Sequence, residues 1–265
     1  AAFSFNFFHG TIPSAFGSRT KLFFFSCRGN LLTGTDMVRT LTQLPSMRIL
    51  LMSDNFFTGD IALTSVSPAL LLLRVEVLCQ APLLYEVIAN NNQLSGSLPT
   101  CVGNWSGFRS MDIGVNLYTG TLPSAFSTMN GLETFVVSSN FLHGHLDDIF
   151  NSSVLGTVGL SDNGFSGSLP LSVFESPALT TFIASKNCFR GTLPVEMCDA
   201  SALQTLALSG LTAGSGCLIS IPILNIYEPR VFEGSIPPCL FSMPTLEQLY
   251  IGGNAIKGKL SEIPP

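Results

Sequence analysis

The chain has 265 residues, of which 46% are hydrophobic and 11% are charged, so apolar side chains must be buried along its length and disorder is excluded. Its net charge at pH 7 is −5 and its 12 Lys and Arg residues are scattered, which argues against binding to nucleic acid or to an anionic membrane surface. The longest apolar stretch, residues 69–78, is interrupted by Arg74 and Glu76 and is shorter than the roughly 20 residues of a membrane helix, so we expect no direct membrane insertion in this segment.

One motif recurs along the whole chain: Asn, an apolar residue two places on, Gly four places on, and often Leu-Pro or Ile-Pro after the Gly. The clearest copies are NFFHGTIP from Asn6, NQLSGSLP from Asn92, NLYTGTLP from Asn116, NGFSGSLP from Asn163 and NCFRGTLP from Asn187. Weaker copies begin at Asn30, Asn55, Asn140 and Asn254, and Leu211 and Arg230 occupy the Asn position of two more. From Asn92 to Leu211 the copies are 23 or 24 residues apart, which predicts a solenoid of about eleven repeats.

Apolar residues also stand eight, five and three places before the motif Asn, as Leu132, Phe135 and Val137 do before Asn140. Alternate residues of a strand point to opposite faces, so this spacing predicts a short parallel strand in each repeat, with its intervening residues on a concave outer face. The Asn side chain should turn inward and satisfy backbone groups at the bend, and the Gly should permit the next turn. The apolar residue of the motif should form a second buried row: Phe8, Phe57, Leu94, Tyr118, Leu142, Phe165, Phe189 and Phe232. A third row should contain Phe16, Phe126 and Phe150.

The resulting pattern, LxxLxLSxNxFxGxLP, resembles the plant-type subclass of leucine-rich repeats over essentially the whole chain. That subclass is found in receptor-like protein ectodomains, in polygalacturonase-inhibiting proteins and in surface antigens of kinetoplastids and other protists. The resemblance implies an α/β-type repeat solenoid, a horseshoe with a parallel concave sheet. It also implies a protein that binds a ligand rather than an enzyme, although a fold alone does not identify the ligand.

Two segments depart from the regular spacing and are expected to form irregular modules, at about 62–91 and 211–229, within a single domain spanning residues 1–265. The motif positions are 37 residues apart between Asn55 and Asn92, and 19 apart between Leu211 and Arg230. Solenoids need polar caps at their ends, and neither end of this sequence shows one. We therefore interpret the sequence as a fragment.

The seven Cys residues leave at least one unpaired within the chain. Cys27 occupies an inward strand position and is predicted to be a buried, inert thiol. Cys79 and Cys101 are 22 residues apart, as are Cys217 and Cys239, and both second members follow Gly-Ser-Leu/Ile-Pro-x. These two pairs are the favoured disulfides, and Cys198–Cys217 is the main alternative.

Two glycosylation sequons, beginning at Asn104 and Asn151, fall 12 and 11 residues after a motif Asn, on the expected convex side where a glycan would fit. Together with the disulfides they favour an extracellular or cell-surface location. His143 and His145 could supply two metal ligands, but a structural site needs more. No nucleophile motif or phosphate-binding loop is present, so we expect no catalytic residues, no metal, no cofactor and no enzymatic activity.

The concave face is the expected contact surface. Six places before the motif Asn stands a column of threonines, Thr134, Thr157, Thr181 and Thr205, which would be spaced by the interstrand distance of about 4.8 Å. The serines two places before the motif Asn belong to the subclass pattern, so we interpret them as structural. The distinctive side chains on this face are Phe24, Arg28, Glu86, Asp112 and Tyr250, and with the four threonines they are the candidate ligand contacts.

The leading functional hypothesis is an extracellular recognition or adhesion module that binds protein or glycan through its concave face. One alternative is an inhibitor of a secreted hydrolase, as the polygalacturonase inhibitors are. The other is the ectodomain of a longer signalling receptor. The nearly uncharged face favours weak contacts summed over several repeats above a single strong contact.

Overall fold

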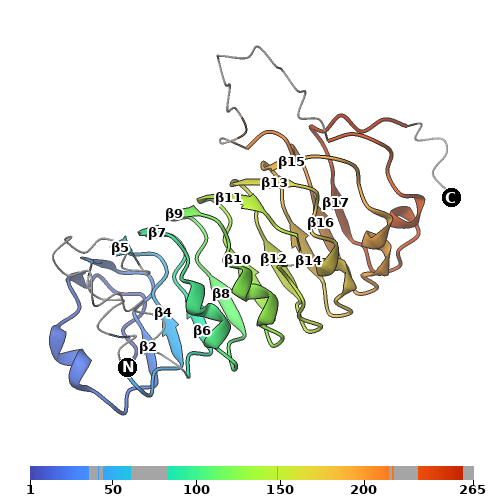
Figure 1. Cartoon of the computed structure of the whole chain (residues 1–265). Helices are drawn as coiled ribbons and strands as arrows, with labels where there is room; N and C mark the ends of the chain where they lie inside the picture. Colours follow the sequence, from blue (N-terminus) through green and yellow to red (C-terminus); the bar gives the residue numbers. More distant parts are fainter. Residues whose placement is uncertain are drawn as a thin grey trace.

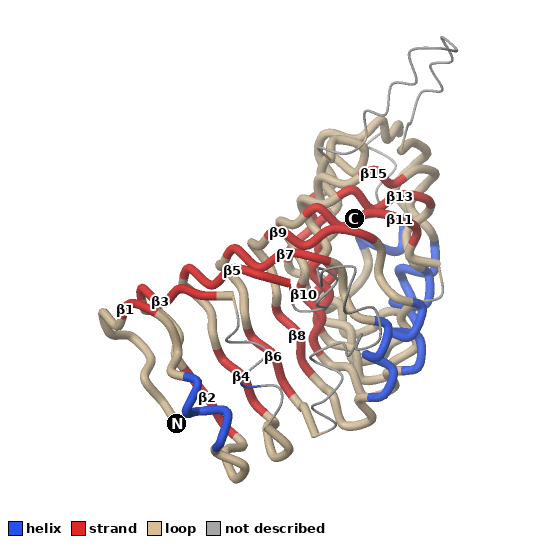
Figure 2. The backbone as a smooth tube through the Cα atoms, turned by 60° about the vertical axis from the view of Figure 1, so that its left-hand side comes forward, coloured by secondary structure: helices blue, strands red, loops and turns tan. Residues whose placement is uncertain are grey.

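The protein is described by a computed structural model that covers residues 1–35, 41, 44–60, 83–147, 149–214, 217 and 232–258. Over these ranges the chain winds into a solenoid with one parallel sheet on each of two sides and short 3-10 helices on a third (Figures 1 and 2). The parallel-sheet solenoid expected from the repeat is confirmed.

Sheet A is formed by the strands that precede the motif Asn, and its nine strands are all parallel. In the register, Phe135 pairs with Met111 on one side and with Val158 on the other, and all three are buried in the core. The inward positions are therefore those predicted from the spacing. The strands are β2 (Phe24–Ser26), β4 (Ile49–Leu51), β6 (Glu86–Ile88), β8 (Ser110–Asp112), β10 (Thr134–Val136), β12 (Thr157–Gly159), β14 (Thr181–Ile183), β16 (Thr205–Ala207) and β17 (Gln248–Tyr250).

Sheet B is an eight-stranded parallel sheet, which the sequence analysis did not anticipate, formed by residues that follow the motif Asn. Its period of two is visible at Tyr118, which is buried while Leu117 and Thr119 on either side are exposed. Gly120 ends its strand with a φ of 85°, a conformation that favours Gly. The strands are β1 (His9–Gly10), β3 (Leu31–Gly34), β5 (Phe56–Asp60), β7 (Gln93–Gly96), β9 (Leu117–Gly120), β11 (Phe141–His145), β13 (Gly164–Gly167) and β15 (Cys188–Phe189).

The helical side consists of short 3-10 helices that each begin directly after a proline of the repeat motif. Pro123, for example, has φ −59° and lacks an N–H, which suits the residue before a helical turn. The helices are η1 (Ser14–Ser18), η4 (Thr100–Asn104), η5 (Ser124–Thr128), η6 (Leu171–Glu175), η7 (Val195–Asp199) and η8 (Pro238–Phe241).

The motif asparagines from Asn30 to Asn187 are buried and join successive coils, whereas Asn6 is exposed and Asn254 is half-buried. The Nδ2 group of Asn140 donates to the carbonyls of Val137 in its own coil, at 2.9 Å, and of Ile113 in the preceding coil, at 3.1 Å. Its Oδ1 accepts the N–H of Tyr118 at 2.9 Å. The same arrangement recurs at Asn55, Asn92, Asn116, Asn163 and Asn187. The predicted inward turn of this side chain is confirmed.

The residue before the motif Asn has a positive φ in every described coil that carries the motif. Glycine occupies this position at Gly29, Gly210 and Gly253, whereas the other coils place L side chains there, including Val115 with φ 53°. A β-branched residue is unfavourable in this left-handed region because its Cβ substituents crowd the backbone. Val115 therefore stores local strain at an exposed position.

The predicted buried rows are present, with two exceptions: Phe8 of the second row, and Phe16 of the third row, which is only partly buried. Phe57, Leu94, Tyr118, Leu142, Phe165, Phe189 and Phe232 are all buried, as are Phe126 and Phe150 of the third row. Phe8 was expected in the second row, but half of its side chain is exposed. It belongs to the outermost coil of the structure, which has a neighbouring coil on one side only.

Leu211 and Arg230 were counted as two repeats, but the described residues on either side of them belong to one coil. Strand β16, before Leu211, pairs directly with β17. Phe232 forms a parallel bridge with Gly191 in the register that sheet B has elsewhere. Most of the expected irregular module at 211–229, and residues 61–82 of the expected module at 62–91, lie outside the described residues.

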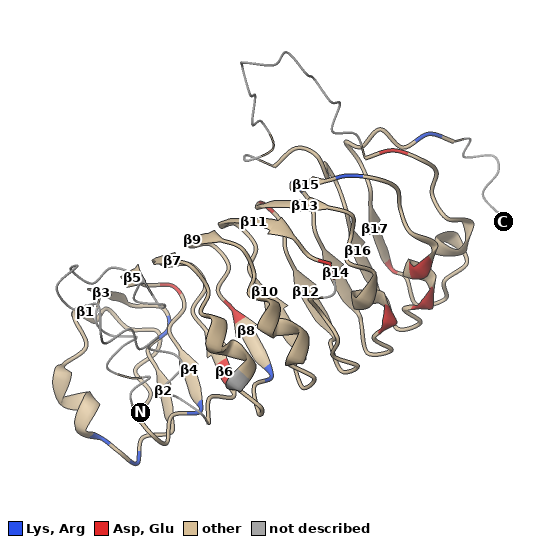
Figure 3. Cartoon of the chain, in the orientation of Figure 1, with Lys and Arg blue, Asp and Glu red and all other residues tan. Residues whose placement is uncertain are grey.

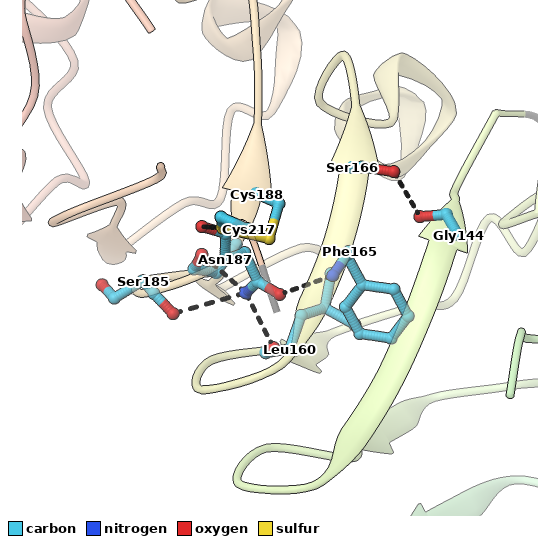
Figure 4. The surroundings of a disulfide bond; sticks show 9 residues. Gly144, Leu160, Phe165, Ser166, Ser185, Asn187, Cys188 and Cys217 are labelled. Atoms are coloured by element: carbon cyan, nitrogen blue, oxygen red, sulfur yellow. Dashed lines mark hydrogen bonds between the residues drawn. A yellow bond between two sulfur atoms is a disulfide. The ribbon is translucent and has the colours of Figure 1, made fainter. Parts of the chain in front are cut away.

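The cysteine pairing differs from the expectation. Cys217 pairs with Cys188 (Figure 4), and Cys239 pairs with Cys198. The expected pairs Cys217–Cys239 and Cys198–Cys217 are therefore both wrong. Cys217 lies beside β15, whereas Cys198 and Cys239 belong to η7 and η8 on the helical side. A disulfide requires Cα atoms within about 7 Å, and the two observed pairs have Cα separations of 5.1 and 6.0 Å.

The remaining cysteines are Cys27, Cys79 and Cys101. Cys101 is disulfide-bonded, but Cys79, its expected partner, lies outside the described residues. Cys27 is a free thiol with no exposed surface, and burial raises its pKa to about 12. The predicted buried, inert thiol is confirmed.

Candidate binding face

Sheet A presents three columns of outward side chains. The first begins at Phe24 and contains the threonines, and the second, here called the central column, begins at Ser26 and ends at Tyr250. The third contains the serines two places before the motif Asn. The strand register aligns each column across successive coils, so neighbours in a column lie about 4.8 Å apart.

The threonine column is continuous from β10 to β16. Thr134 pairs with Thr157, Thr157 with Thr181, and Thr181 with Thr205. All four side chains are half-buried, so each presents its hydroxyl and methyl group at the surface. The structure thus brings together the four threonines that the sequence placed on this face.

The central column is mainly aliphatic, and the sequence analysis missed this. Leu51, Ile88, Val136 and Ile183 are half-exposed, and they stand four places before the motif Asn. The sequence analysis examined the second and sixth positions before the motif Asn and took only Asp112 and Tyr250 from the fourth. The full column is Ser26, Leu51, Ile88, Asp112, Val136, Gly159, Ile183, Ala207 and Tyr250.

The serine column is held by hydrogen bonds within the sheet. Ser53 Oγ contacts Asn90 Oδ1 at 2.5 Å, and Ser185 Oγ accepts the N–H of Ser209 at 3.0 Å. Ser185 also accepts an amide hydrogen bond from Asn187 through its backbone carbonyl (Figure 4). These contacts support the structural role expected for this column.

Charge on sheet A is confined to its amino-terminal half. Among the described strands of the sheet, only β6 and β8 carry acidic residues, Glu86 and Asp112 (Figure 3). Burial raises the pKa of the Asp112 carboxyl, and the negative charge of Asp54 raises it further. The N–H of Gly114, which donates to the carboxyl at 3.0 Å, and the positive charge of Arg28 oppose this rise. Arg28 is half-buried, and its Nε forms no hydrogen bond within the described part of the chain. Arg28 and Asp112 therefore belong to one electrostatic group that spans four coils.

The two aromatic candidates lie at opposite edges of sheet A. Phe24 is half-buried on β2, and Tyr250 is 53% exposed on β17. Because seven strands separate them, a small ligand could not contact both. Glu86 and Asp112 lie on the adjacent strands β6 and β8, and β8 pairs with β10, where the threonine column begins. Glu86, Asp112 and the threonines therefore form a continuous surface.

Sheet B presents a second outer surface, with an apolar column and a hydroxyl column. Leu31, Phe56, Leu117 and Phe141 are exposed large apolar residues one place after the motif Asn. Two places further on stand Thr33, Thr58, Ser95, Thr119, His143 and Ser166. Thr119 Oγ1 donates to the carbonyl of Gly96 in the preceding coil at 3.4 Å, and Thr33 and Ser166 make the equivalent contact.

Within the described residues no cluster of three or more His, Cys, Asp or Glu side chains could hold a metal ion. His143 and His145 lie on β11, both exposed, and His145 approaches Asp147 at 3.7 Å. In the same described part of the chain no helix is long and apolar enough to cross a membrane.

No protein-family profile matches the chain, and no curated protein is similar to it. Solved structures are similar. The structure of a TDR receptor is 27% identical with a TM-score of 0.74, and the match covers 97% of this chain and 39% of that one. The Arabidopsis receptor kinase HAESA, in complex with the peptide hormone IDA and the co-receptor SERK1, is 23% identical with a TM-score of 0.70, covering 97% and 37%. A plant ice-binding protein is 20% identical with a TM-score of 0.66, covering 94% and 70%.

These likenesses show that the chain has a leucine-rich-repeat fold and resembles plant-type receptor ectodomains. The chain spans about two fifths of the length of the receptors.

Proposed function

We propose that this leucine-rich-repeat chain is an extracellular recognition module that binds an extended segment of a protein or peptide across sheet A. The observation that carries the proposal is the central column, in which Leu51, Ile88, Val136 and Ile183 remain half-exposed. Val136 and Ile183 stand between hydroxyl side chains of the threonine and serine columns. Aliphatic side chains gain free energy when a ligand covers them, and the flanking hydroxyls can bond the ligand backbone.

The two disulfides of the described residues support an extracellular location, because disulfides persist in oxidising compartments. The HAESA structure, which contains a peptide hormone, supports a peptide ligand. A glycan has less support, because aromatic side chains that could stack on sugar rings stand on the described strands of sheet A only at Phe24 and Tyr250 near its edges.

The test is a selection of linear peptides from a displayed library on the immobilised protein, followed by hydrogen-exchange mapping of the selected peptides. We expect protection on β8, β10, β12 and β14. Val136→Arg should weaken binding at least about tenfold, or about 1.4 kcal/mol, because it places a charge in the apolar column. The matched control is Val154→Arg, at an exposed valine away from sheet A, which should bind as the parent does.

Peptides that protect only sheet B or the helical side would contradict the proposal. Equal loss of binding in the two variants would also contradict it. The same holds if the protein binds glycans on a glycan array but selects no peptides. A hydrolase inhibitor and the ectodomain of a longer receptor could both use this binding face. An assay of secreted hydrolases mixed with the protein separates them, because only an inhibitor should lower the hydrolase activity.

A second candidate function, adsorption to ice, is favoured by sheet B. Its outward column repeats at the interstrand distance and carries hydroxyls on β7, β9 and β13, with His143 between them on β11. The strands from β7 to β13 carry no Asp, Glu, Lys or Arg. The hydroxyl of Thr119 donates to the carbonyl of Gly96 at 3.4 Å. A periodic array with few charges suits a partner that is itself a lattice, and the ice-binding plant protein shares the fold.

Ice adsorption is tested by thermal hysteresis and by inhibition of ice recrystallisation. Thr119→Lys should abolish both effects, because a long charged side chain keeps the array off a flat surface. Thr134→Lys is the matched control, at a half-buried threonine of sheet A. Absence of both effects in the parent protein at high concentration would reject this candidate and leave the peptide proposal unaffected.

A further inference from the structure

The coil that follows Asn140 differs from its neighbours on the helical side. It has 23 residues up to Asn163, and its motif ends in Leu146-Asp147, where the adjacent coils have Leu-Pro. The neighbouring coils form η5 and η6 after Pro123 and Pro170. Residues 149–152 form no helix, because the proline that sets the backbone for the helical turn is missing.

In this non-helical segment, buried and exposed residues alternate. Phe150 is buried and packs against Phe135 with a ring-centroid distance of 5.4 Å. Asn151 is exposed, Ser152 is buried, and Ser153 is exposed. In an extended segment, residues two places apart share one side, so Asn151 and Ser153 both face outward.

The buried serine between them fixes the segment to the preceding coil. Ser152 Oγ donates to the carbonyl of Leu132 at 2.8 Å and contacts the carbonyl of Asn130 at 3.0 Å. By contrast, no hydrogen bond holds the amide of Asn151 in the described part of the chain. Asn151 is thus a free outward amide on an anchored segment, whereas the motif asparagines on either side of it, Asn140 and Asn163, are buried with their amides bonded.

We propose that Asn151 is a site of N-linked glycosylation. Asn151-Ser152-Ser153 is an acceptor sequon, and both of its defining residues, the Asn and the Ser two places on, are exposed. The donor is an oligosaccharide joined through pyrophosphate to a polyprenyl lipid. The amide nitrogen of Asn151 forms a bond to C1 of the first sugar. The bond between C1 and the pyrophosphate oxygen breaks, and its electron pair stays on the pyrophosphate. A base of the oligosaccharide-transferring enzyme takes the amide proton.

The inference rests on the extracellular location of the proposed function, because this transfer occurs in the secretory pathway. It does not depend on the ligand. Asn151 belongs to the helical side, so a glycan there leaves the outward columns of sheets A and B uncovered. The bulky, hydrated sugar would instead cover the exposed surface of the non-helical segment around Asn151.

The experiment uses the full chain expressed behind a cleavable signal peptide in a eukaryotic cell line. Both the secreted and the retained fractions are treated with peptide N-glycosidase in heavy-oxygen water, and the tag on residue 151 is located by mass spectrometry. We expect the tag in both fractions. Asn151→Gln and Ser153→Ala should each remove one glycan from the intact mass.

The matched control is Ser152→Ala, which removes the two buried hydrogen bonds but preserves the sequon, so it should retain the glycan. An untagged residue 151 in translocated protein overturns the proposal, whether or not other residues are tagged. If Ser152→Ala loses the glycan while Ser153→Ala keeps it, the modification is not sequon-directed and the proposal is also wrong. Peptide binding by an unglycosylated but folded protein would leave the function proposed for sheet A standing.

Discussion

The side-chain oxygen of Asn140 accepts the backbone N–H of Tyr118, 22 residues earlier, at 2.9 Å. One coil therefore completes the hydrogen bonding of the coil before it. Because the bonded groups are buried, this amide adds a satisfied polar contact to the strand pairing that joins the two coils.

Asn140→Ala should destabilise the protein by about 2 kcal/mol, because it removes the side-chain partner of the buried N–H of Tyr118. The carbonyls of Ile113 and Val137 each lose one of two amide donors and keep the other, from Asn116 and Asn163. Urea unfolding followed by circular dichroism measures the loss. Asn130→Ala is the control, since Asn130 is exposed, and it should change stability by less than about 0.5 kcal/mol. Equal losses in the two variants would contradict the role assigned to the motif Asn.

Val115→Asn should stabilise the protein by about 1 kcal/mol. Val115 holds a β-branched side chain at φ 53°, whereas Asn tolerates this region and already occupies the equivalent position as Asn91 in the preceding coil. The readout is the melting temperature. Val154→Asn, at an exposed valine without a positive φ, should give no gain. A gain at both positions would mean that removal of exposed apolar surface, rather than strain, is responsible.

Asp112→Asn should raise the melting temperature at neutral pH by about 1–2 °C. Burial raises the folded-state pKa of Asp112, so the folded protein binds more protons than the unfolded chain between the two pKa values. Ionisation of Asp112 therefore costs stability above the folded-state pKa, and the cost disappears below the unfolded value of about 3.9. The two melting temperatures should converge as the pH falls towards 3. A constant difference across this range would show that the charge is not responsible.

Cys27 should resist alkylation in the native protein. Its thiol is fully buried, and with a pKa of about 12 almost none of it is thiolate at pH 8. Iodoacetamide labelling followed by peptide mapping should modify Cys27 only after denaturation. Labelling within minutes under native conditions would mean that the coil around β2 opens readily.

The repeat spacing predicted the fold because it records the coil geometry directly. Phe135 and Val137 had to face inward for a 24-residue coil to cover its neighbour, and the motif Asn had to bond the bend. Sheet B was less accessible, because its period of two depends on Leu117 being exposed beside the buried Tyr118, and an apolar residue at an outward position hides the alternation in the sequence. The aliphatic central column was accessible, at the fourth place before each motif Asn.

The disulfides were less accessible from sequence. The interruption after Leu211 has no period, so the spacing could not place Cys217 on the side of sheet B and Cys239 on the helical side. Cys217 and Cys239 are 22 residues apart, as Cys79 and Cys101 are, but this equal spacing does not reflect a bond between Cys217 and Cys239. Cysteine spacing alone does not determine connectivity.

The coil divided between Leu211 and Phe232 keeps its neighbours in register: β17 pairs with β16, and Phe232 bridges to Gly191, as though the chain between them were absent. Disulfides flank this point on both sides, through Cys188–Cys217 and Cys198–Cys239. The register of the neighbouring coils therefore does not depend on the length of chain inserted at this point. New sequence, even a separate folded unit, could be accommodated there during evolution or by engineering while the stacking of the coils stayed the same.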